Sequence, residues 1–187
     1  MKNADKDPLE WEEISTQHIV NDEWIDFRRS AYRFPDGNTY EPFYSYSRKD
    51  YVVVVAKDTK GQYLCVRQYR QGIKRVTTEF PAGGIERGDT MEDALMAAKR
   101  ELLEETGYES DNWKHLLSIP SNATIADNYA HIYYAADCRK VAEQDLDIYE
   151  FLNAECHSAD EIEEMIENGS FPQAVHVMAW LLAARCN

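Results

Sequence analysis

The sequence predicts an α/β fold in which a mixed β-sheet lies between helices. One group of strand-like segments precedes a single amphipathic helix, a second group follows it, and two further helical segments close the chain. Strands and helices therefore do not alternate regularly, which favours a mixed sheet over a doubly wound parallel sheet. The 187 residues are enough for one domain with a sizeable core and a small extension.

The chain begins with a segment, residues 1–47, that predicts a small antiparallel β extension. Residues 24–33 and 40–46 are rich in aromatic and β-branched side chains, which are typical of strands. The sequence Pro-Asp-Gly at positions 35–37 is a turn signal between them. We expect the two strands to pair and to form a unit beside the main domain, residues 48–187.

The main domain combines predicted strands with predicted helices. The strands are expected at residues 51–56, 63–70, 76–80, 115–119, 130–136 and 148–154. After them, one helix begins at Ser158, where Glu161 completes a capping box, and ends at Asn168. A last helix covers residues 172–185.

The composition excludes several classes of function. A formal net charge of −14 repels polyanions, so we expect no binding to nucleic acid through a basic surface. The longest apolar run, residues 52–56, is far too short to span a bilayer, and the first residues lack the apolar core of a signal peptide. We therefore expect a cytoplasmic protein that contacts no membrane. An acidic protein that acts on phosphates would need a cation to neutralise both partners.

The helix in the middle of the chain carries three acidic residues at close spacing. It is predicted to start at an N-cap, Thr90, and to end at Gly107. Positions i, i+3 and i+4 share a face, so Glu101, Glu104 and Glu105 project together. Like charges so placed repel one another by a few tenths of a kcal/mol per pair, roughly, and a bound Mg²⁺ would reverse that repulsion.

The surroundings of this helix favour a metal site over an ordinary acidic surface. An isolated E-x-x-E-E pattern is most often a solvated helix face. Here a predicted strand ends in a Pro-Ala-Gly-Gly loop at 81–84, whose free carbonyl groups can face a metal. Arg100 precedes the acidic residues and can pair with an acid in the loop upstream, which would fix the loop to the helix.

Residues 100–108, RELLEETGY, match the second half of the Nudix box, G-x5-E-x7-R-E-U-x-E-E-x-G-U, in which U is a bulky apolar residue. The first half departs from it. Counting six residues on from Gly83 reaches Asp89, whereas counting eight back from Arg100 reaches Glu92. The loop therefore carries a three-residue insertion. Either acid can take the first acidic position, and we favour Glu92 because a loop accepts an insertion more easily than a helix does.

The resemblance to Nudix hydrolases implies a metal-dependent hydrolase with a Nudix-type α/β/α sandwich and a mixed sheet. Glu101 and Glu105 would be the principal metal ligands, assisted by Glu104, and the backbone carbonyl of Ala82 or Gly83 would be a further ligand. The implied cofactor is Mg²⁺, with Mn²⁺ as a substitute. The family hydrolyses a diphosphate that is linked to another moiety, and metal ions bridge the phosphates.

Two further motifs resemble the branch that contains ADP-ribose pyrophosphatases and nucleoside-diphosphate-sugar hydrolases. They are RQYR at 67–70 and E-F-P-A-G at 79–83. In this comparison Arg70, Glu79 and Arg67 are substrate-binding candidates, since a guanidinium group can form paired hydrogen bonds to phosphate. The implied substrate is a nucleoside diphosphate sugar, similar to ADP-ribose, that is cleaved to a nucleoside monophosphate and a sugar phosphate.

The same branch bears on assembly and on substrate choice. Its additional N-terminal strands pair two subunits, so the extension of residues 1–47 predicts a homodimer. The branch commonly has a Ser-Pro-Gly triplet about fifteen residues after the box, whereas residues 120–124 read PSNAT here. A sugar nucleotide other than ADP-ribose is therefore an open alternative.

The general base is expected in a later acidic loop. Glu150 is the first candidate, followed by Asp147 and Asp145, because related enzymes take the base or another metal ligand from such a loop. His176 has no partner pattern and is given no role. The alternative function is a Nudix-fold module that binds a nucleotide sugar without cleaving it. Its acidic residues would not need to be complete, so the intact cluster favours the enzyme.

Overall fold

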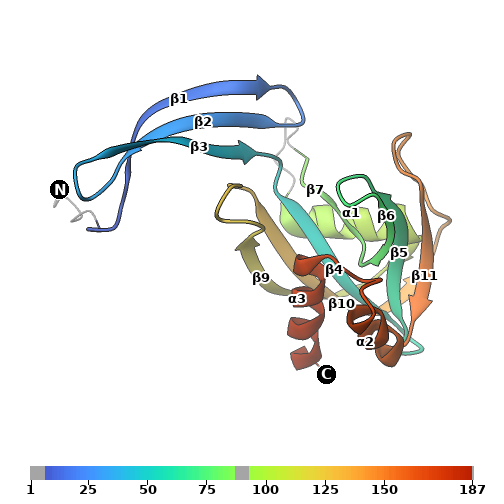
Figure 1. Ribbon diagram of the computed structural model, residues 1–187. Coiled ribbons are helices and arrows are strands. Elements are labelled where there is room, and N and C mark those ends of the chain that lie inside the picture. Colours follow the sequence, from blue (N-terminus) through green and yellow to red (C-terminus); the bar gives the residue numbers. More distant parts are fainter. Residues whose placement is uncertain (1–6, 87–92, 187) are drawn as a thin grey trace. The chain divides into compact units, whose positions relative to one another are not determined.

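The computed structural model describes residues 7–86 and 93–186 (Figure 1). The Cα positions divide the chain into two compact units. The first contains Met1–Lys49 and Pro120–Asn128, and the second contains Asp50–Ile119 and Tyr129–Asn187. The first unit thus includes a short segment from the middle of the chain in addition to the predicted extension.

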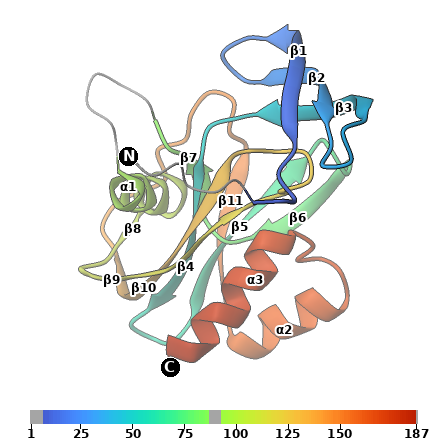
Figure 2. The same ribbon diagram turned by 90° about the vertical axis from the view of Figure 1, so that its left-hand side faces the viewer.

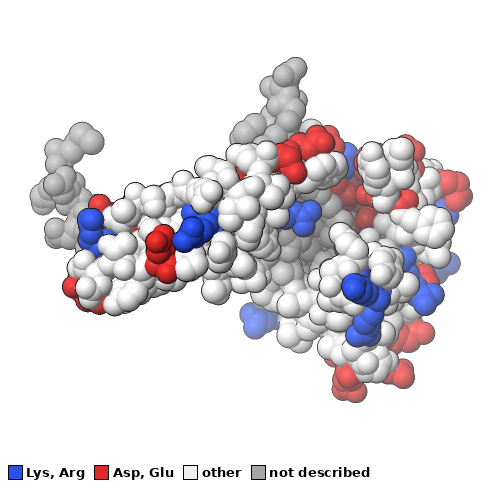
Figure 3. Space-filling model, turned by 45° about the horizontal axis from the view of Figure 1, so that its top comes forward, with Lys and Arg blue, Asp and Glu red and all other residues white. Residues whose placement is uncertain are grey.

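The first unit is built on a three-stranded antiparallel sheet in the order β1-β2-β3, formed by β1 (Glu12–Asn21), β2 (Asp26–Arg33) and β3 (Thr39–Ser47). The turn expected at 35–37 is present, and Gly37 adopts a φ of 85° there. The strands β2 and β3 confirm the predicted pair, whereas β1 was not predicted. The part of Figure 3 that shows this sheet is mostly uncharged, with separate basic and acidic patches.

The second unit is built on an eight-stranded mixed sheet in its described part. The central order is β11-β5-β4-β10-β8, with β6 beside β5, β7 beside β4, and β9 beside β10. The pair β4–β10 is parallel, and the pairs β4–β5, β4–β7, β5–β6, β5–β11 and β8–β10 are antiparallel. The strands are β4 (Tyr51–Asp58), β5 (Tyr63–Arg70), β6 (Arg75–Glu79), β7 (Ala82–Gly84), β8 (Tyr108–Glu109), β9 (Asn112–Pro120), β10 (Tyr129–Lys140) and β11 (Leu152–His157).

Helices cover both faces of this sheet (Figure 2). The helix α1 (Ala94–Thr106) packs through Ala97, Ala98 and Leu102 on one face, against alternate residues of the buried strand β4. The remaining residues of β4 face a second core, which includes side chains of α2 (Ala159–Glu167) and α3 (Ala174–Ala183). A 3-10 turn, η1 (Ala184–Cys186), follows α3. Successive strand residues point to opposite faces, so one buried strand serves both cores and produces the predicted α/β/α layers.

Local signals predicted the end of α1 and both ends of α2 correctly, whereas α3 is two residues shorter at each end than the expected 172–185. The residue after α1 is Gly107, with a left-handed φ of 74°, and Ser158 and Glu161 form the expected capping box before α2. The expected N-cap of α1 was wrong. Asp93 caps this helix by accepting a hydrogen bond from the Met96 amide, and Thr90 lies outside the described residues.

The last strand begins four residues later than expected. We predicted a strand over residues 148–154, but β11 starts at Leu152. Ile148, Tyr149 and Phe151 are 86–97% exposed in the loop before it. The prediction was wrong because these apolar residues resemble the sequence of a buried strand although they are exposed. Among the described residues, no helix is both long and apolar enough to cross a membrane.

Candidate metal and substrate site

Two of the three predicted helix carboxylates lie together on the buried side of α1. Glu101 and Glu105 are one turn apart and only 5% and 2% exposed. They lie on the side of the helix that also carries the core residues Ala98 and Leu102. Glu104 lies farther round the helix, and its side chain is 37% exposed. The expectation that all three project together thus holds in full only for Glu101 and Glu105.

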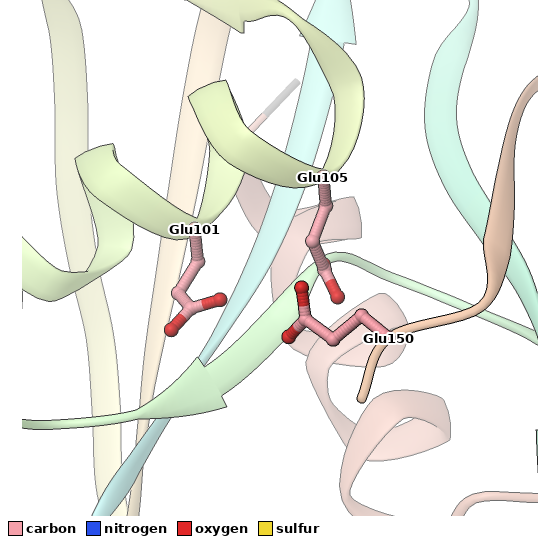
Figure 4. A group of neighbouring side chains, drawn as sticks. All are labelled: Glu101, Glu105 and Glu150. Atoms are coloured by element: carbon pink, nitrogen blue, oxygen red, sulfur yellow. The ribbon is translucent and has the colours of Figure 1, made fainter. Parts of the chain in front are cut away.

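A third carboxylate reaches these two from a distant part of the sequence. Glu101, Glu105 and Glu150 each offer a ligand oxygen, and these atoms lie within 4.8 Å of one another. Figure 4 shows the two glutamates of α1 pointing toward Glu150, which comes from the loop before β11. The other two base candidates are not in this group. Asp145 donates its amide to the carbonyl of Glu104, and Asp147 donates its amide to Glu150 Oε2 at 3.1 Å.

The strand β7 brings backbone groups to the same place. Val54 donates to Pro81, and Ile85 donates to Asp50, so Ala82 occupies the alternate, non-hydrogen-bonded position opposite Val53. Its amide and carbonyl therefore point away from β4. The amide donates to Glu105 Oε2 at 2.9 Å, which places the carbonyl on the edge that faces α1.

Gly83 lies so close to Glu101 that a side chain at position 83 would displace the Glu101 carboxylate. A Cβ atom on Gly83 would lie 2.1 Å from the carboxylate carbon of Glu101. This glycine is therefore required for a close approach of backbone and carboxylate. The expected first acids of the box, Asp89 and Glu92, both lie outside the described residues.

Arg100 connects the helix to the loop before it. Its Nη1 donates to Glu101 Oε1 at 2.8 Å and to Glu104 Oε2 at 2.9 Å, and its Nη2 donates to the Gly84 carbonyl at 2.9 Å. The arginine therefore orients two acidic side chains and holds the end of β7 with a single guanidinium group. This contact links the loop to the helix through the Gly84 backbone carbonyl, whereas the sequence analysis expected an acidic side chain of the loop as the partner.

Burial and mutual repulsion raise the proton affinity of the paired carboxylates. Burial raises the pKa of Glu101 to about 7, although Arg100 acts in the opposite direction. Burial raises the pKa of Glu105 well above its usual value, the Ala82 amide opposes this shift, and Glu101 and Glu150 increase it. Three carboxylates in a poorly solvated place are unfavourable without a counter-charge. Oxygen donors of this kind fit Mg²⁺ or Mn²⁺, and a divalent cation would provide that charge.

Arg70 and Glu79 form a second charged cluster beside the first. Arg70 on β5 donates through Nε and Nη2 to both carboxylate oxygens of Glu79, at 2.5–3.1 Å. Glu79 is fully buried and also accepts from Thr77 and from Gln173. Burial alone would raise the pKa of Glu79, but the hydrogen bonds from Arg70 and Thr77 and the charge of Arg70 lower it below its usual value. Arg70 also interacts electrostatically with Glu105.

Arg67 does not join this cluster. The register of β5 with β6 and β11 is regular, so residues 67 and 70 point to opposite faces of the sheet. Arg67 is exposed, whereas Arg70 is partly buried beside Glu79. The structure therefore separates the two arginines that the sequence motif placed together as substrate-binding candidates.

Two residues near the site were missed by the sequence analysis. His176 is buried, accepts the Phe80 amide at Nδ1, and lies 4.0 Å from Glu79. Burial lowers the pKa of His176 to about 4, which keeps the imidazole neutral. Gln144 donates to the backbone carbonyl of Glu105 at 2.6 Å. Neither residue has a local sequence signal, because both contacts join segments that are far apart in the chain.

Known proteins that resemble this chain share the domain that contains the site. The NUDIX domain model matches residues 47–181. The methanol dehydrogenase activator of Bacillus methanolicus is 30% identical over 133 residues, which are 68% of this chain and 66% of the relative. The ADP-ribose pyrophosphatase of Bacillus subtilis is 28% identical over 151 residues, or 77% and 76% of the two chains. The ADP-sugar pyrophosphatase of Mus musculus is 31% identical over 109 residues, or 52% and 49%.

A solved structure confirms the predicted fold class. The crystal structure of an ADP compounds hydrolase superposes with a TM-score of 0.82 over 97% of this chain and 96% of its own, at 19% identity. At this identity the likeness concerns the fold. Together with the domain match, which covers more than half of the sequence and includes every described site residue discussed above, it shows that the chain belongs to the NUDIX domain family.

Proposed function

We propose that this chain is a Nudix pyrophosphohydrolase that uses Mg²⁺, or Mn²⁺ in its place, to cleave a nucleoside diphosphate sugar such as ADP-ribose. The observation that carries the proposal is the convergence of Glu101, Glu105 and Glu150 within 4.8 Å of one another. The sequence similarity to pyrophosphatases that act on ADP-ribose and ADP-sugars supports the substrate class.

The proposed roles follow from the positions of the side chains. Glu101 and Glu105 would hold the metal, with Glu104 helping and the Ala82 carbonyl as a further ligand on the same edge. When bound, the metal supplies positive charge that neutralises the diphosphate and polarises its P–O bonds. Arg100 would keep Glu101 in place through its 2.8 Å contact.

Glu150 would act as the general base. Its carboxylate lies beside the two metal-binding glutamates but comes from a loop rather than from the helix. It would accept the proton of the attacking water, whose oxygen forms the new bond to phosphorus while the bond to the bridging oxygen breaks. Arg70, held by Glu79, would bind an anionic oxygen of the substrate. Arg67 stays a weaker candidate, because it lies on the opposite face of the sheet.

The first experiment is product analysis with Mg²⁺ over a panel of ADP-ribose, ADP-glucose, GDP-mannose, UDP-glucose, NADH and a dinucleoside polyphosphate. We expect at least one of them to give a nucleoside monophosphate and the matching phosphate ester, and Glu105→Gln to abolish this cleavage. If no compound is cleaved with Mg²⁺ or Mn²⁺, while a nucleotide sugar still binds, the protein is a binding module and the proposed activity is wrong.

We also propose that the chain forms a homodimer through its N-terminal sheet. Aromatic side chains of this unit, including Trp11, Trp24, Tyr40 and Tyr44, are 44–63% exposed in the single chain. Large exposed apolar surfaces on one element are common in subunit interfaces. Sedimentation equilibrium of the full chain tests the proposal, and a monomer at micromolar concentration would contradict it.

A further inference from the structure

The segment that leads from β10 to Glu150 is attached to the end of α1. We call residues 141–145 the anchor segment. The amides of Val141 and Ala142 donate to the Gly107 carbonyl at 2.9 and 3.1 Å, and the amide of Asp145 donates to the Glu104 carbonyl at 2.9 Å. The last carbonyl groups of a helix have no partners within the helix. The anchor segment supplies donors to them.

This attachment is closely packed. Gly107 has a left-handed φ of 74°, and a Cβ atom on it would lie 2.1 Å from the Ala142 carbonyl oxygen. The glycine therefore both ends the helix and admits the anchor segment against it. The contact also fixes which residues of the segment face the helix end.

Gln144 adds a side-chain contact to these backbone bonds. Its Nε2 donates to the carbonyl of Glu105 at 2.6 Å. Glu105 is one of the two buried carboxylate residues of α1, so this bond links the backbone of the proposed metal ligand directly to the chain that carries Glu150. A turn completes the connection, because Glu150 donates its amide to Asp147 and accepts the Asp147 amide at its carboxylate.

Burial does little to hold the residues around Glu150. Ile148, Tyr149 and Phe151 are 88%, 86% and 97% exposed, so the side chains on either side of Glu150 contribute almost no packing. The position of the Glu150 carboxylate then depends on the hydrogen bonds that precede it and on β11, which begins two residues later at the buried Leu152. We propose that Gln144 is a positioning residue, which holds the Glu150 loop in the register that places this carboxylate beside Glu101 and Glu105. The inference rests on the proposed role of Glu150 as the base.

The test is a double-mutant cycle with Gln144→Met and Glu150→Gln, assayed with Mg²⁺ and the substrate that the product analysis identifies. Methionine keeps the length of the side chain and removes the donor. We expect Gln144→Met to lower kcat by about tenfold, the size typical of residues that orient a catalytic group, and to change KM by less than about twofold. In the Glu150→Gln background, the same substitution should have no further effect. The matched control is Glu143→Gln, since the Glu143 side chain is 91% exposed and contacts Lys140 instead of α1.

Amide hydrogen exchange provides a readout that does not depend on activity. Residues 146–151 should exchange faster in Gln144→Met than in the wild type or in Glu143→Gln, while α1 is unchanged. Unchanged exchange in this loop, or an equal loss of kcat in both backgrounds, would overturn the proposal. If Glu150→Gln retained the wild-type kcat, the assignment of the base would be wrong, and the exchange comparison would still decide whether Gln144 holds the loop.

Discussion

Glu79 at the end of β6 and Glu105 on α1 are two fully or almost fully buried carboxylates, but their surroundings affect their charge in opposite ways. Glu79 accepts hydrogen bonds from Arg70, Thr77 and Gln173, and its pKa lies below the usual value. Glu105 accepts one amide, from Ala82, and has other carboxylates as neighbours, so its pKa lies well above the usual value. The protein thus compensates the buried charge of Glu79 with its own donors. The charge of Glu105 has no comparable set of donors, and a bound cation could compensate it.

If the proposed function is correct, this difference separates a structural charge from a functional one. A buried carboxylate with a complete set of donors needs no ligand, and breaking its pair destabilises the fold. A buried carboxylate without a counter-charge is unfavourable in the free protein, and it favours the binding of a cation. The two clusters should therefore respond differently to the same kind of substitution.

The largest expected effect is on activity, from Glu105→Gln. We expect turnover to fall by more than about a hundredfold, beyond the 10–100-fold typical of groups that only support a metal ligand. The free energy of unfolding without metal should be unchanged or higher, because the amide removes a buried acidic group whose charge is repelled by Glu101 and Glu150. Steady-state kinetics and urea unfolding in EDTA measure the two quantities. Unchanged turnover, or loss of the folded state, would contradict the assignment.

The second prediction concerns the compensated pair. Arg70→Gln should lower the free energy of unfolding by about 3–4 kcal/mol, because it leaves the Glu79 charge buried without its main partner. This loss lies in the lower part of the range that is usual when one partner of a buried ion pair is removed, since the Arg70 side chain is 33% exposed.

The matched control for this substitution is Arg67→Gln on the opposite face of the same strand. It should change the free energy of unfolding by less than about 0.5 kcal/mol, as is usual for exposed positions. Urea unfolding at pH 7 measures both variants. Equal effects of the two substitutions would show that the Arg70–Glu79 pair does not stabilise the fold.

The third prediction concerns pH in the absence of metal. The pKa of Glu101 is raised to about 7, so the folded protein takes up this proton before the unfolded chain does. The free energy of unfolding should therefore increase as the pH falls from about 7 toward 4.5, and this gain should be lost as the pH rises again. Glu101 alone should contribute no more than about 3 kcal/mol to the gain.

The difference in the free energy of unfolding between the wild type and Glu101→Gln, followed as a function of pH, isolates the contribution of Glu101 from those of other groups. Thermal unfolding in EDTA between pH 5 and pH 8 measures it. Saturating Mg²⁺ should abolish the gain at low pH, because protons and the cation compete for the same carboxylates. A difference that does not depend on pH would contradict the raised pKa.

The smallest effect is expected from Gly83→Ala. The added Cβ would meet the Glu101 carboxylate, so that side chain must move away from Glu105 and Glu150. We expect activity to fall by roughly tenfold, which corresponds to about 1.4 kcal/mol of transition-state stabilisation, with a smaller change in stability. Gly72→Ala is the control, because nothing lies within 4 Å of a Cβ atom there. Equal activities of the two variants would show that this close approach is unimportant.

Features encoded in adjacent residues were predictable from the sequence. The capping box at Ser158 and the helix end at Gly107 depend on residues within one turn, and both occur as expected. The same kind of signal gave a wrong prediction where two possible capping residues lie close together, since Asp93 rather than Thr90 is the N-cap of α1. The apolar residues before Leu152 predicted a strand, but burial rather than composition decides where a strand begins.

The arrangement of the site was only partly predictable. The spacing on α1 indicated the face shared by Glu101 and Glu105, and the acidic loop indicated Glu150. The separation of Arg67 from Arg70 follows from strand alternation and could have been deduced from the predicted strand. The contact of Gln144 with Glu105, however, joins residues 39 positions apart, and no local pattern identifies it.

The pairing of Arg70 with a fully buried carboxylate has a consequence for the strength of substrate binding. A free arginine side chain loses about 2 kcal/mol of rotational entropy when it becomes ordered around an anion. In this protein the Glu79 carboxylate has already restricted that motion during folding, and Nη1 lies outside the bonds that restrict it. An incoming phosphate that binds at Nη1 would therefore meet a preorganised donor, and more of the energy of that contact would appear as affinity.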